Sequence, residues 1–169
     1  MPKITPCLWF DTQAEEAATF YVSVFPNSRI LETSRYGDAG PGEPGAVMVV
    51  NFELDGTKYV GLNGGPQFAF TEAVSFQIDC ADQAETDYYW DALLAGGGEE
   101  SQCGWLKDRF GLSWQVVPRG MIELVTDADP ARSQRAMTAM MGMRRLDVAA
   151  AARAADGVPD EAPAGAGAG

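Results

Sequence analysis

The chain has 169 residues, of which 46% are hydrophobic and none is histidine, and its formal net charge is −12. This length suits one domain of ordinary size or two small modules that share a core. The negative charge disfavours binding to nucleic acid or anionic lipid, because phosphate groups would be repelled. The absence of histidine excludes Ser-His-Asp and Cys-His catalytic systems and zinc sites built on histidine.

The sequence shows no feature of a membrane-spanning or secreted protein. No apolar run approaches the roughly 20 residues that cross a bilayer, and no basic segment precedes an apolar stretch as in a signal peptide. Cys7, Cys80 and Cys103 show no C-x-x-C spacing, so we expect free thiols and no disulfide framework. These features predict a cytoplasmic protein that binds neither membranes nor nucleic acid.

The first part of the chain is predicted to form one strand, one helix and three further strands. A strand over residues 3–10 leads into an acidic helix start at residues 11–16, and Pro26-Asn27 ends that helix. The later strands are expected over residues 29–36, 46–54 and 57–63. Asp55-Gly56 joins the last two and is typical of a hairpin turn, whereas the glycine-rich residues 37–45 must form a loop.

The same order of elements is predicted again after residues 64–66. A strand over residues 73–80 leads into a helix that starts at residues 82–85 and ends at three glycines. Shorter strands are expected over residues 99–103, 105–108 and 112–117. Positions on one face of the second helix lie 69 residues after their counterparts in the first, as in Ala17 and Thr86. This similarity indicates an internal repeat of one supersecondary unit.

We therefore divide the chain into four parts: a first module with its linker at 1–66, a second module at 67–120, a C-terminal helical extension at 121–157 and a tail at 158–169. In the extension, Asp129-Pro130 predicts a helix start, and Asp147 is expected to cap a last short helix through Ala155. A methionine stripe on the first of these helices is typical of a core or an interface. The tail is rich in Pro, Ala, Gly and acidic residues, so we expect it to be disordered.

Several stretches point to a family. They are PCLWFDTQAEEAATFYVSVFPNSRI (6–30), GLNGGP (61–66), DRFGLSWQVVP (108–118) and MRRLDVAAAARAADG (143–157). With the paired modules, they resemble the vicinal oxygen chelate superfamily, or glyoxalase/bleomycin-resistance fold, and within it the PhnB-like branch. Members of that branch often carry the label demethylubiquinone 3-methyltransferase-like. The resemblance implies an α+β fold of two βαβββ modules, a curved mixed sheet with a concave pocket, and a homodimer.

Two segments with the same alternation, VSFQI (74–78) and LSWQV (112–116), indicate which side chains would line that pocket. On the implied fold the polar residues would line the pocket. The apolar residues would face the helices, namely Val74, Phe76 and Ile78 in the first segment and Leu112, Trp114 and Val116 in the second. The predicted site also includes the positions that the resemblance makes equivalent to these in the first module, and a nearby tyrosine. The predicted ligand-binding residues are Pro6, Tyr59, Asn63, Ser75, Gln77, Ser113 and Gln115.

Metal-using members of the superfamily take their ligands from the first and fourth strands of each module. The resemblance maps these positions onto Pro6, Ser75, Gln115 and either Asn63 or Gly61. None of these residues is charged, so we expect no metal ion at the usual place. A site made only of carboxylates, involving Glu53 or Glu99, has no spacing to support it.

The neutral side chains have two interpretations, which the sequence leaves open. Amides and hydroxyls suit hydrogen bonding to an uncharged or zwitterionic ligand in an apolar cup. They can equally satisfy neighbouring backbone groups or ordered water.

Three kinds of function follow. We predict a metal-independent small-molecule-binding protein that uses no cofactor. The first alternative is an enzyme of the same fold, either a lyase or isomerase or the methyltransferase of the family label, although the chain lacks the G-x-G-x-x-G turn of a common donor site. The second alternative is an interaction protein that docks through its Met-rich helix.

Overall fold

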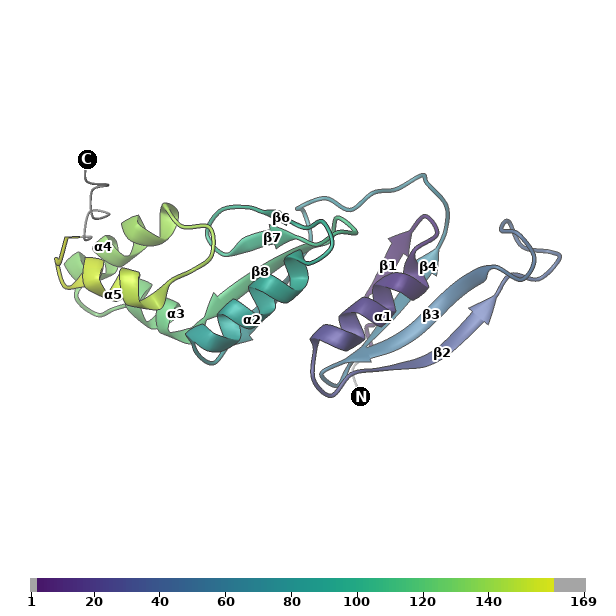
Figure 1. Ribbon diagram of the computed structural model, residues 1–169, viewed down its shortest axis with the longest axis horizontal. Helices are drawn as coiled ribbons and strands as arrows, with labels where there is room; N and C mark the ends of the chain where they lie inside the picture. The colour runs from purple at the N-terminus through teal and green to yellow at the C-terminus, as the bar shows by residue number, and fades with distance from the viewer. Residues whose placement is uncertain (1–2, 160–169) are drawn as a thin grey trace, which may run out of the picture. The chain divides into compact units, whose positions relative to one another are not determined.

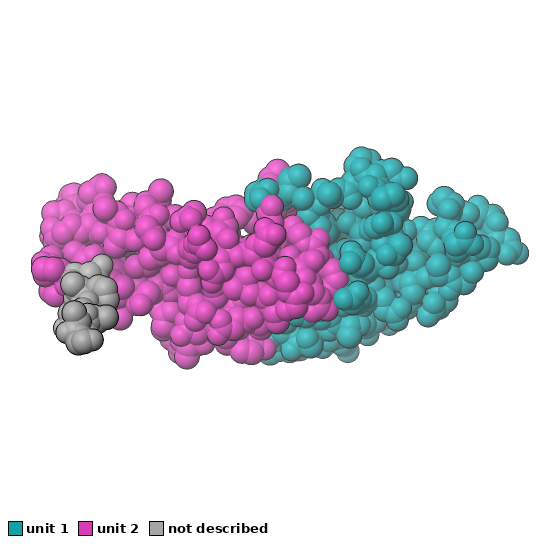
Figure 2. All heavy atoms as spheres, turned by 45° about the horizontal axis from the view of Figure 1, so that its top comes forward, with its two compact units in different colours: residues 1–72 teal, residues 73–169 magenta. Residues whose placement is uncertain are grey.

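The computed structural model describes residues 3–159 and has the expected α+β architecture of two βαβββ modules followed by helices (Figure 1). The chain divides into two compact units, Met1–Glu72 and Ala73–Gly169, which Figure 2 shows in separate colours. This division falls after Glu72, whereas the sequence pattern predicts a boundary between the modules after residue 66. None of the described helices is long and apolar enough to cross a membrane.

The first unit is a four-stranded mixed sheet with one helix. Its elements are β1 (Cys7–Phe10), α1 (Ala14–Val24), β2 (Arg29–Arg35), β3 (Val47–Leu54) and β4 (Thr57–Asn63). The strand order is β1-β4-β3-β2, with β1 parallel to β4 and the other pairs antiparallel. The expected strand over residues 3–10 begins only at Cys7, because Pro6 has no N–H to donate to a neighbouring strand.

The helix α1 covers one face of this sheet (Figure 1). Its face toward the sheet is rich in buried alanines, which lets the helix lie close to the strands. A Cβ atom at Gly61 would lie 3.3 Å from the Cβ of Ala14, so glycine permits this approach. Aromatic rings fill the remaining space, where Tyr59 stacks on Phe52 and Phe52 stacks on Tyr21. The hydrophobic core of the unit therefore lies between α1 and β3 and β4.

The second unit repeats this arrangement with shorter outer strands. Its first elements are β5 (Ser75–Cys80), α2 (Gln83–Leu94), β6 (Glu99–Glu100), β7 (Trp105–Lys107) and β8 (Ser113–Pro118), in the strand order β5-β8-β7-β6. The carboxylate of Asp82 accepts a hydrogen bond from the N–H of Glu85 and starts the helix. The expected strand over 99–103 ends at Glu100, because Cys103 has a φ of 56° and the chain turns back there.

The internal repeat is real, but its strands and helices follow different spacings. Buried helix positions are related by 69 residues, as in Tyr21 and Trp90. Leu8 and Phe76 both face their helices, because register places Leu8 beside Gly61 and Phe76 beside the helix-facing Trp114, and they are only 68 residues apart. The second unit has one more residue between its first strand and the helical core positions. The structure therefore aligns Ser75 with Cys7 and not with Pro6.

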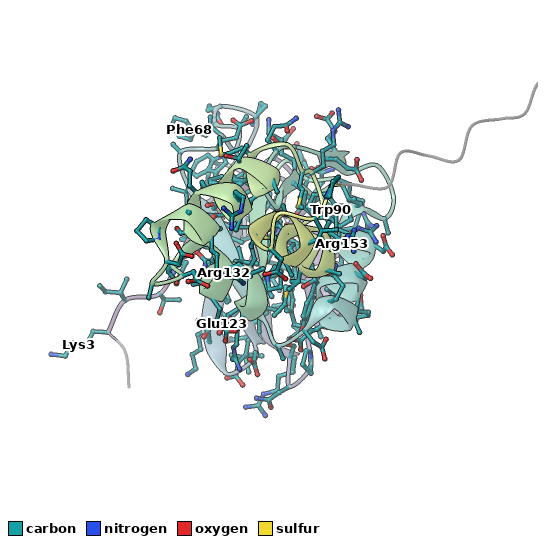
Figure 3. The ribbon with its side chains drawn as sticks, turned by 90° about the vertical axis from the view of Figure 1, so that its left-hand side faces the viewer. Lys3, Phe68, Trp90, Glu123, Arg132 and Arg153 are labelled. Atoms are coloured by element: carbon teal, nitrogen blue, oxygen red, sulfur yellow. The ribbon has the colours of Figure 1, made fainter. Side chains whose placement is uncertain are left out.

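The C-terminal residues form three helices, α3 (Arg119–Val125), α4 (Pro130–Met141) and α5 (Val148–Ala155). Met121, Leu146 and Ala151 form their small buried core. As expected, Asp129 and Asp147 cap α4 and α5 by accepting backbone N–H groups. Figure 3 labels Arg132, which pairs with Asp127 and Asp156 and so joins the segments that flank α4 and α5. Residues 160–169, most of the tail expected to be disordered, lie outside the described residues.

The methionines of α4 do not form one buried stripe. Met140 is partly buried and packs, with Met143, against the small core of the extension. Met141, at the end of the helix, is 61% exposed. Ala136 is the residue of α4 that is fully buried. One part of the stripe therefore packs against the core of the extension, and another part lies on the surface.

Candidate functional site

A pocket of about 460 Å³ lies in the first unit, where β1 and β4 end and α1 begins. Its walls come from the start of α1, the loop between β2 and β3, and the residues that follow β4. The lining residues are Asp11, Thr12, Glu15, Tyr36, Pro41, Gly42, Glu43, Ala46, Val47, Asn63, Gly64, Gly65, Pro66 and Gln67.

Asn63 forms hydrogen bonds with three of the segments that line this pocket. Its side-chain oxygen accepts a hydrogen bond from the N–H of Ala14 at 2.8 Å, and its amide nitrogen donates to the carbonyl of Val47 at 3.1 Å. The hydroxyl of Tyr36 donates to the backbone carbonyl of Asn63 at 2.5 Å. A buried amide engaged in this way fixes the first turn of α1 and both ends of the loop between β2 and β3.

The charges that line the pocket are all negative. They belong to Asp11, Glu15 and Glu43, and within residues 3–159 none of these carboxylates has a hydrogen bond or ion pair.

The ring of Tyr36 forms part of the pocket wall, and the loop between β2 and β3 lies directly against it. A Cβ atom at Gly40 would come within 2.7 Å of this ring, so the loop needs glycine there.

A second polar surface lies on the sheet of the second unit, on the face away from α2. The helix-facing side is identified by Leu106 and Trp114, which are buried, and by Glu100, which accepts a hydrogen bond from the indole N–H of Trp90. On the opposite face, register places side chains in two rows across the strands. One row is Glu99, Lys107, Ser113 and Ser75, and the next is Trp105, Gln115 and Gln77.

Within these rows, Ser113 is unusual. The side-chain amide of Gln115 donates to the hydroxyl of Ser75 at 2.9 Å. Ser113 is 1% exposed, and its hydroxyl has no hydrogen-bond partner among the described residues. Most buried polar atoms in proteins have a partner, so an unpaired one calls for an explanation.

The structure brings Ser75, Gln77, Ser113 and Gln115 onto one face, as the alternation predicts. Val74 was expected to face the helices, but it precedes β5 and is 63% exposed. The other predicted residues lie in the first unit, and two of them point toward α1. Tyr59 packs on Phe52 there, and Asn63 bonds to Ala14. Pro6 precedes β1, and its carbonyl accepts a hydrogen bond from the N–H of Val60.

Several residues of these two surfaces were not among the predicted ones. Asp11 and Glu15 were interpreted only as the acidic start of a helix, and Tyr36 and Glu43 flank or belong to an expected loop. Trp105 and Lys107 could have been found, because their strand was expected and its alternation points both to the face of Gln115 and Ser113.

Two of the three cysteine thiols are poorly suited to act as nucleophiles, because their pKa values are raised. Burial raises the pKa of Cys7, and burial is also the main reason that the pKa of Cys80 rises from 9.0 to about 11. Among residues 3–159, no three His, Cys, Asp or Glu side chains are grouped so that they could hold a metal ion. Glu53 lies 3.9 Å from the guanidinium of Arg29 and forms an ion pair with it.

Residues 2–117 match the model of the 3-demethylubiquinone-9 3-methyltransferase family. The chain belongs to this family. The PhnB protein from Bacillus cereus is 34% identical, with a TM-score of 0.63 over 69% of this chain and 99% of the other. Protein PA1353 from Pseudomonas aeruginosa is 19% identical, with a TM-score of 0.58 over 70% of this chain and 98% of the other. A search among curated proteins found no match.

The expected superfamily and branch are thus confirmed, and the 3-demethylubiquinone-9 3-methyltransferase family shares the vicinal oxygen chelate fold. A glyoxylase/bleomycin resistance protein/dioxygenase domain from Frankia sp. EAN1pec is more distant, at 12% identity and a TM-score of 0.43 over 70% of this chain and 91% of the other. The family match ends at residue 117, so the helices α3, α4 and α5 lie beyond it.

Proposed function

We propose that this member of the family binds a small organic molecule on the sheet of the second unit, without a metal ion. The observation that carries the proposal is the gathering of Ser75, Gln77, Ser113 and Gln115 on one face of β5 and β8. Hydroxyls and amides bind uncharged ligands through hydrogen bonds, and as neutral groups they are weak ligands for a transition-metal ion. The bond between Gln115 and Ser75 shows that two of them already lie within hydrogen-bonding distance.

Two further parts of the proposal come from the family. We expect the protein to act as a homodimer and to work in the cytoplasm. Light scattering on the full chain tests the first expectation, and a mass close to that of one chain, 18.1 kDa, would contradict it.

The binding proposal is tested by nuclear magnetic resonance on the ¹⁵N-labelled full chain. A set of uncharged and zwitterionic fragments is added, first without metal and then with nickel or zinc. We expect fragments to shift the backbone signals of β5 and β8 without metal, and Gln115→Ala to weaken this binding at least fivefold. Gln102→Ala is the control, because Gln102 is exposed and its side chain has no partner among the described residues. Binding that requires a metal, or shifts confined to other elements, would contradict the proposal.

A second candidate function is supported by the pocket of the first unit. Its volume of about 460 Å³ lies within the range of roughly 300–1,000 Å³ that is common for small-molecule sites. Because Asp11, Glu15 and Glu43 are its charged lining residues, an organic cation is the ligand class that fits. The ring of Tyr36 can add a cation–π contact.

Three molecules of similar size test this second candidate: benzylammonium, benzyl alcohol and benzoate. We expect benzylammonium to bind most tightly, and Asp11→Asn combined with Glu43→Gln to weaken it at least tenfold. Asp38→Asn is the matched control, since Asp38 belongs to the same loop and does not line the pocket. Equal binding of benzoate would contradict the candidate.

A further inference from the structure

We infer that the ligand of the second unit carries an oxygen acceptor, a carbonyl or a carboxylate, on an aromatic ring system. This inference rests on the proposed function, because it concerns the same face of β5, β7 and β8. Its starting point is the hydroxyl of Ser113, which is buried and has no partner among the described residues. A ligand that bonds to this hydroxyl would satisfy a group that the folded chain leaves unpaired.

The neighbours of Ser113 decide which kind of group the ligand must present. Ser75 lies beside it in the register and already accepts a hydrogen bond from Gln115, so the hydroxyl proton of Ser75 is left to donate. The pair Ser75 and Ser113 therefore offers hydroxyl donors from two adjacent strands. A ligand that meets it needs an acceptor, and a carbonyl or carboxylate oxygen has two lone pairs to accept more than one bond.

The next row indicates the remainder of the ligand. Trp105 lies directly opposite Gln115, and both are partly exposed on the same face as Ser113. An indole ring stacks on flat aromatic groups with a gain beyond the buried area alone. The geometry thus places an aromatic wall next to a donor row, and an aromatic carbonyl compound satisfies both. Trp105 does not belong to the set expected from the sequence, so it is added to the site.

A pair of probes with the same shape tests the acceptor directly. The probes are 2-acetylnaphthalene, which has a C=O group, and 2-isopropenylnaphthalene, which has a C=CH₂ group in its place. A third probe, 2-naphthoate, carries a charged carboxylate. Dissociation constants are measured on the full chain by ¹⁵N chemical-shift titration, with the indole signal of Trp105 as the local reporter. We expect both oxygen-bearing probes to bind at least fivefold more tightly than the isopropenyl compound.

Ser113→Ala separates recognition from folding. Because the hydroxyl is buried without a partner, its removal should leave the melting temperature unchanged or raise it, while the preference for the acetyl compound disappears. Ser101→Ala is the control, since Ser101 is exposed near the same strands and should change neither result. If both naphthalenes bind this face equally, or if Ser113→Ala keeps the preference, the inference is overturned and the proposed function stands. If no probe shifts the signals of this face, both are overturned.

Discussion

The side-chain oxygen of Asn63 accepts a hydrogen bond from the backbone N–H of Ala14 at 2.8 Å, and this bond joins the end of β4 to the first residue of α1. Gln13, at the cap position of this helix, makes no side-chain capping bond. A residue from a distant strand therefore accepts a hydrogen bond from the first turn of α1, a role that a local Ser, Thr or Asp commonly has in other helices. The same amide also donates to Val47, so one side chain connects three elements.

Asn63→Ala should lower the free energy of unfolding by about 2 kcal/mol, because it removes the side-chain bonds to the N–H of Ala14 and to the carbonyl of Val47. Urea denaturation measures the change. Asn51→Ala is the matched control, since Asn51 lies on β3 and its side chain has no bond among the described residues. We expect that control to change stability by less than about 0.5 kcal/mol. Similar losses in both variants would contradict the role of Asn63.

Asp108 organises the turn between β7 and β8. Its carboxylate accepts hydrogen bonds from the N–H groups of Phe110 and Leu112 and from the indole N–H of Trp114, and it is 3% exposed. Asp108→Ala would remove the acceptor of all three hydrogen bonds, so we expect a loss of about 3 kcal/mol in the free energy of unfolding. Asp38→Ala, a change of an exposed loop carboxylate, should have little effect. An equal response of the two variants in thermal denaturation would rule this role out.

The sequence predicted the polar face of the second unit better than the pocket of the first. The alternation in residues 75–78 and 113–116 is local, and it assigns side chains to faces without knowledge of the remaining chain. The pocket depends on contacts between distant residues. Tyr36 and Asn63 are 27 positions apart, and their hydrogen bond decides where the loop between β2 and β3 lies. No local pattern in a glycine-rich loop contains that information.

The repeat shows a second limit of reasoning from spacing. Helix positions 69 residues apart are equivalent in the structure, and Pro6 and Ser75, which the resemblance placed at equivalent strand positions, are also 69 residues apart. One additional residue before the core positions of α2 changes the strand spacing to 68. Since side chains alternate between faces, a shift of one residue moves a position to the opposite face of the sheet. This is why Pro6 is not the counterpart of Ser75.

Cys80 should be the least reactive thiol of the folded chain. Burial is the main cause that raises its pKa from 9.0 to about 11, and the residue has no exposed surface. A rise of this size lowers the thiolate fraction near pH 8.5 on the order of a hundredfold. Alkylation with iodoacetamide, followed by mass spectrometry, should therefore modify Cys103 and the exposed Cys7 well before Cys80. Labelling of all three at similar rates in the folded protein would contradict the expectation.

The same shift predicts how stability depends on alkaline pH. The folded chain holds the Cys80 proton up to a pH of about 11, whereas the unfolded chain loses it near 9.0. The folded state therefore binds more protons in this window, and the free energy of unfolding should fall as the pH rises through it. Cys80→Ala should show a smaller fall in urea denaturation at pH 8.5 and 10.5. A fall as steep as in the parent protein would assign the effect to other groups.

Gln83 attaches the C-terminal helices to the rest of the second unit. Its amide nitrogen donates to the carbonyl of Leu146 at 2.9 Å, and its oxygen accepts from the N–H of Val148 at 3.0 Å. One side chain of α2 thus binds the segment that leads into α5. Arg145 adds ion pairs to Asp87 and Asp91, but these groups are more exposed and each pair contributes less.

Gln83→Ala should therefore loosen α5 without unfolding the sheet. We expect amide hydrogen exchange to become at least tenfold faster over residues 146–155, while the amides of β5 and β8 keep their protection. Loss of two hydrogen bonds at one attachment point favours such local opening, because the remaining contacts of α5 bury mostly alanine. Arg145→Ala, measured in parallel, should have a smaller effect, because its ion pairs are more exposed. Equal acceleration in the sheet would show that Gln83 supports the whole unit and not the extension alone.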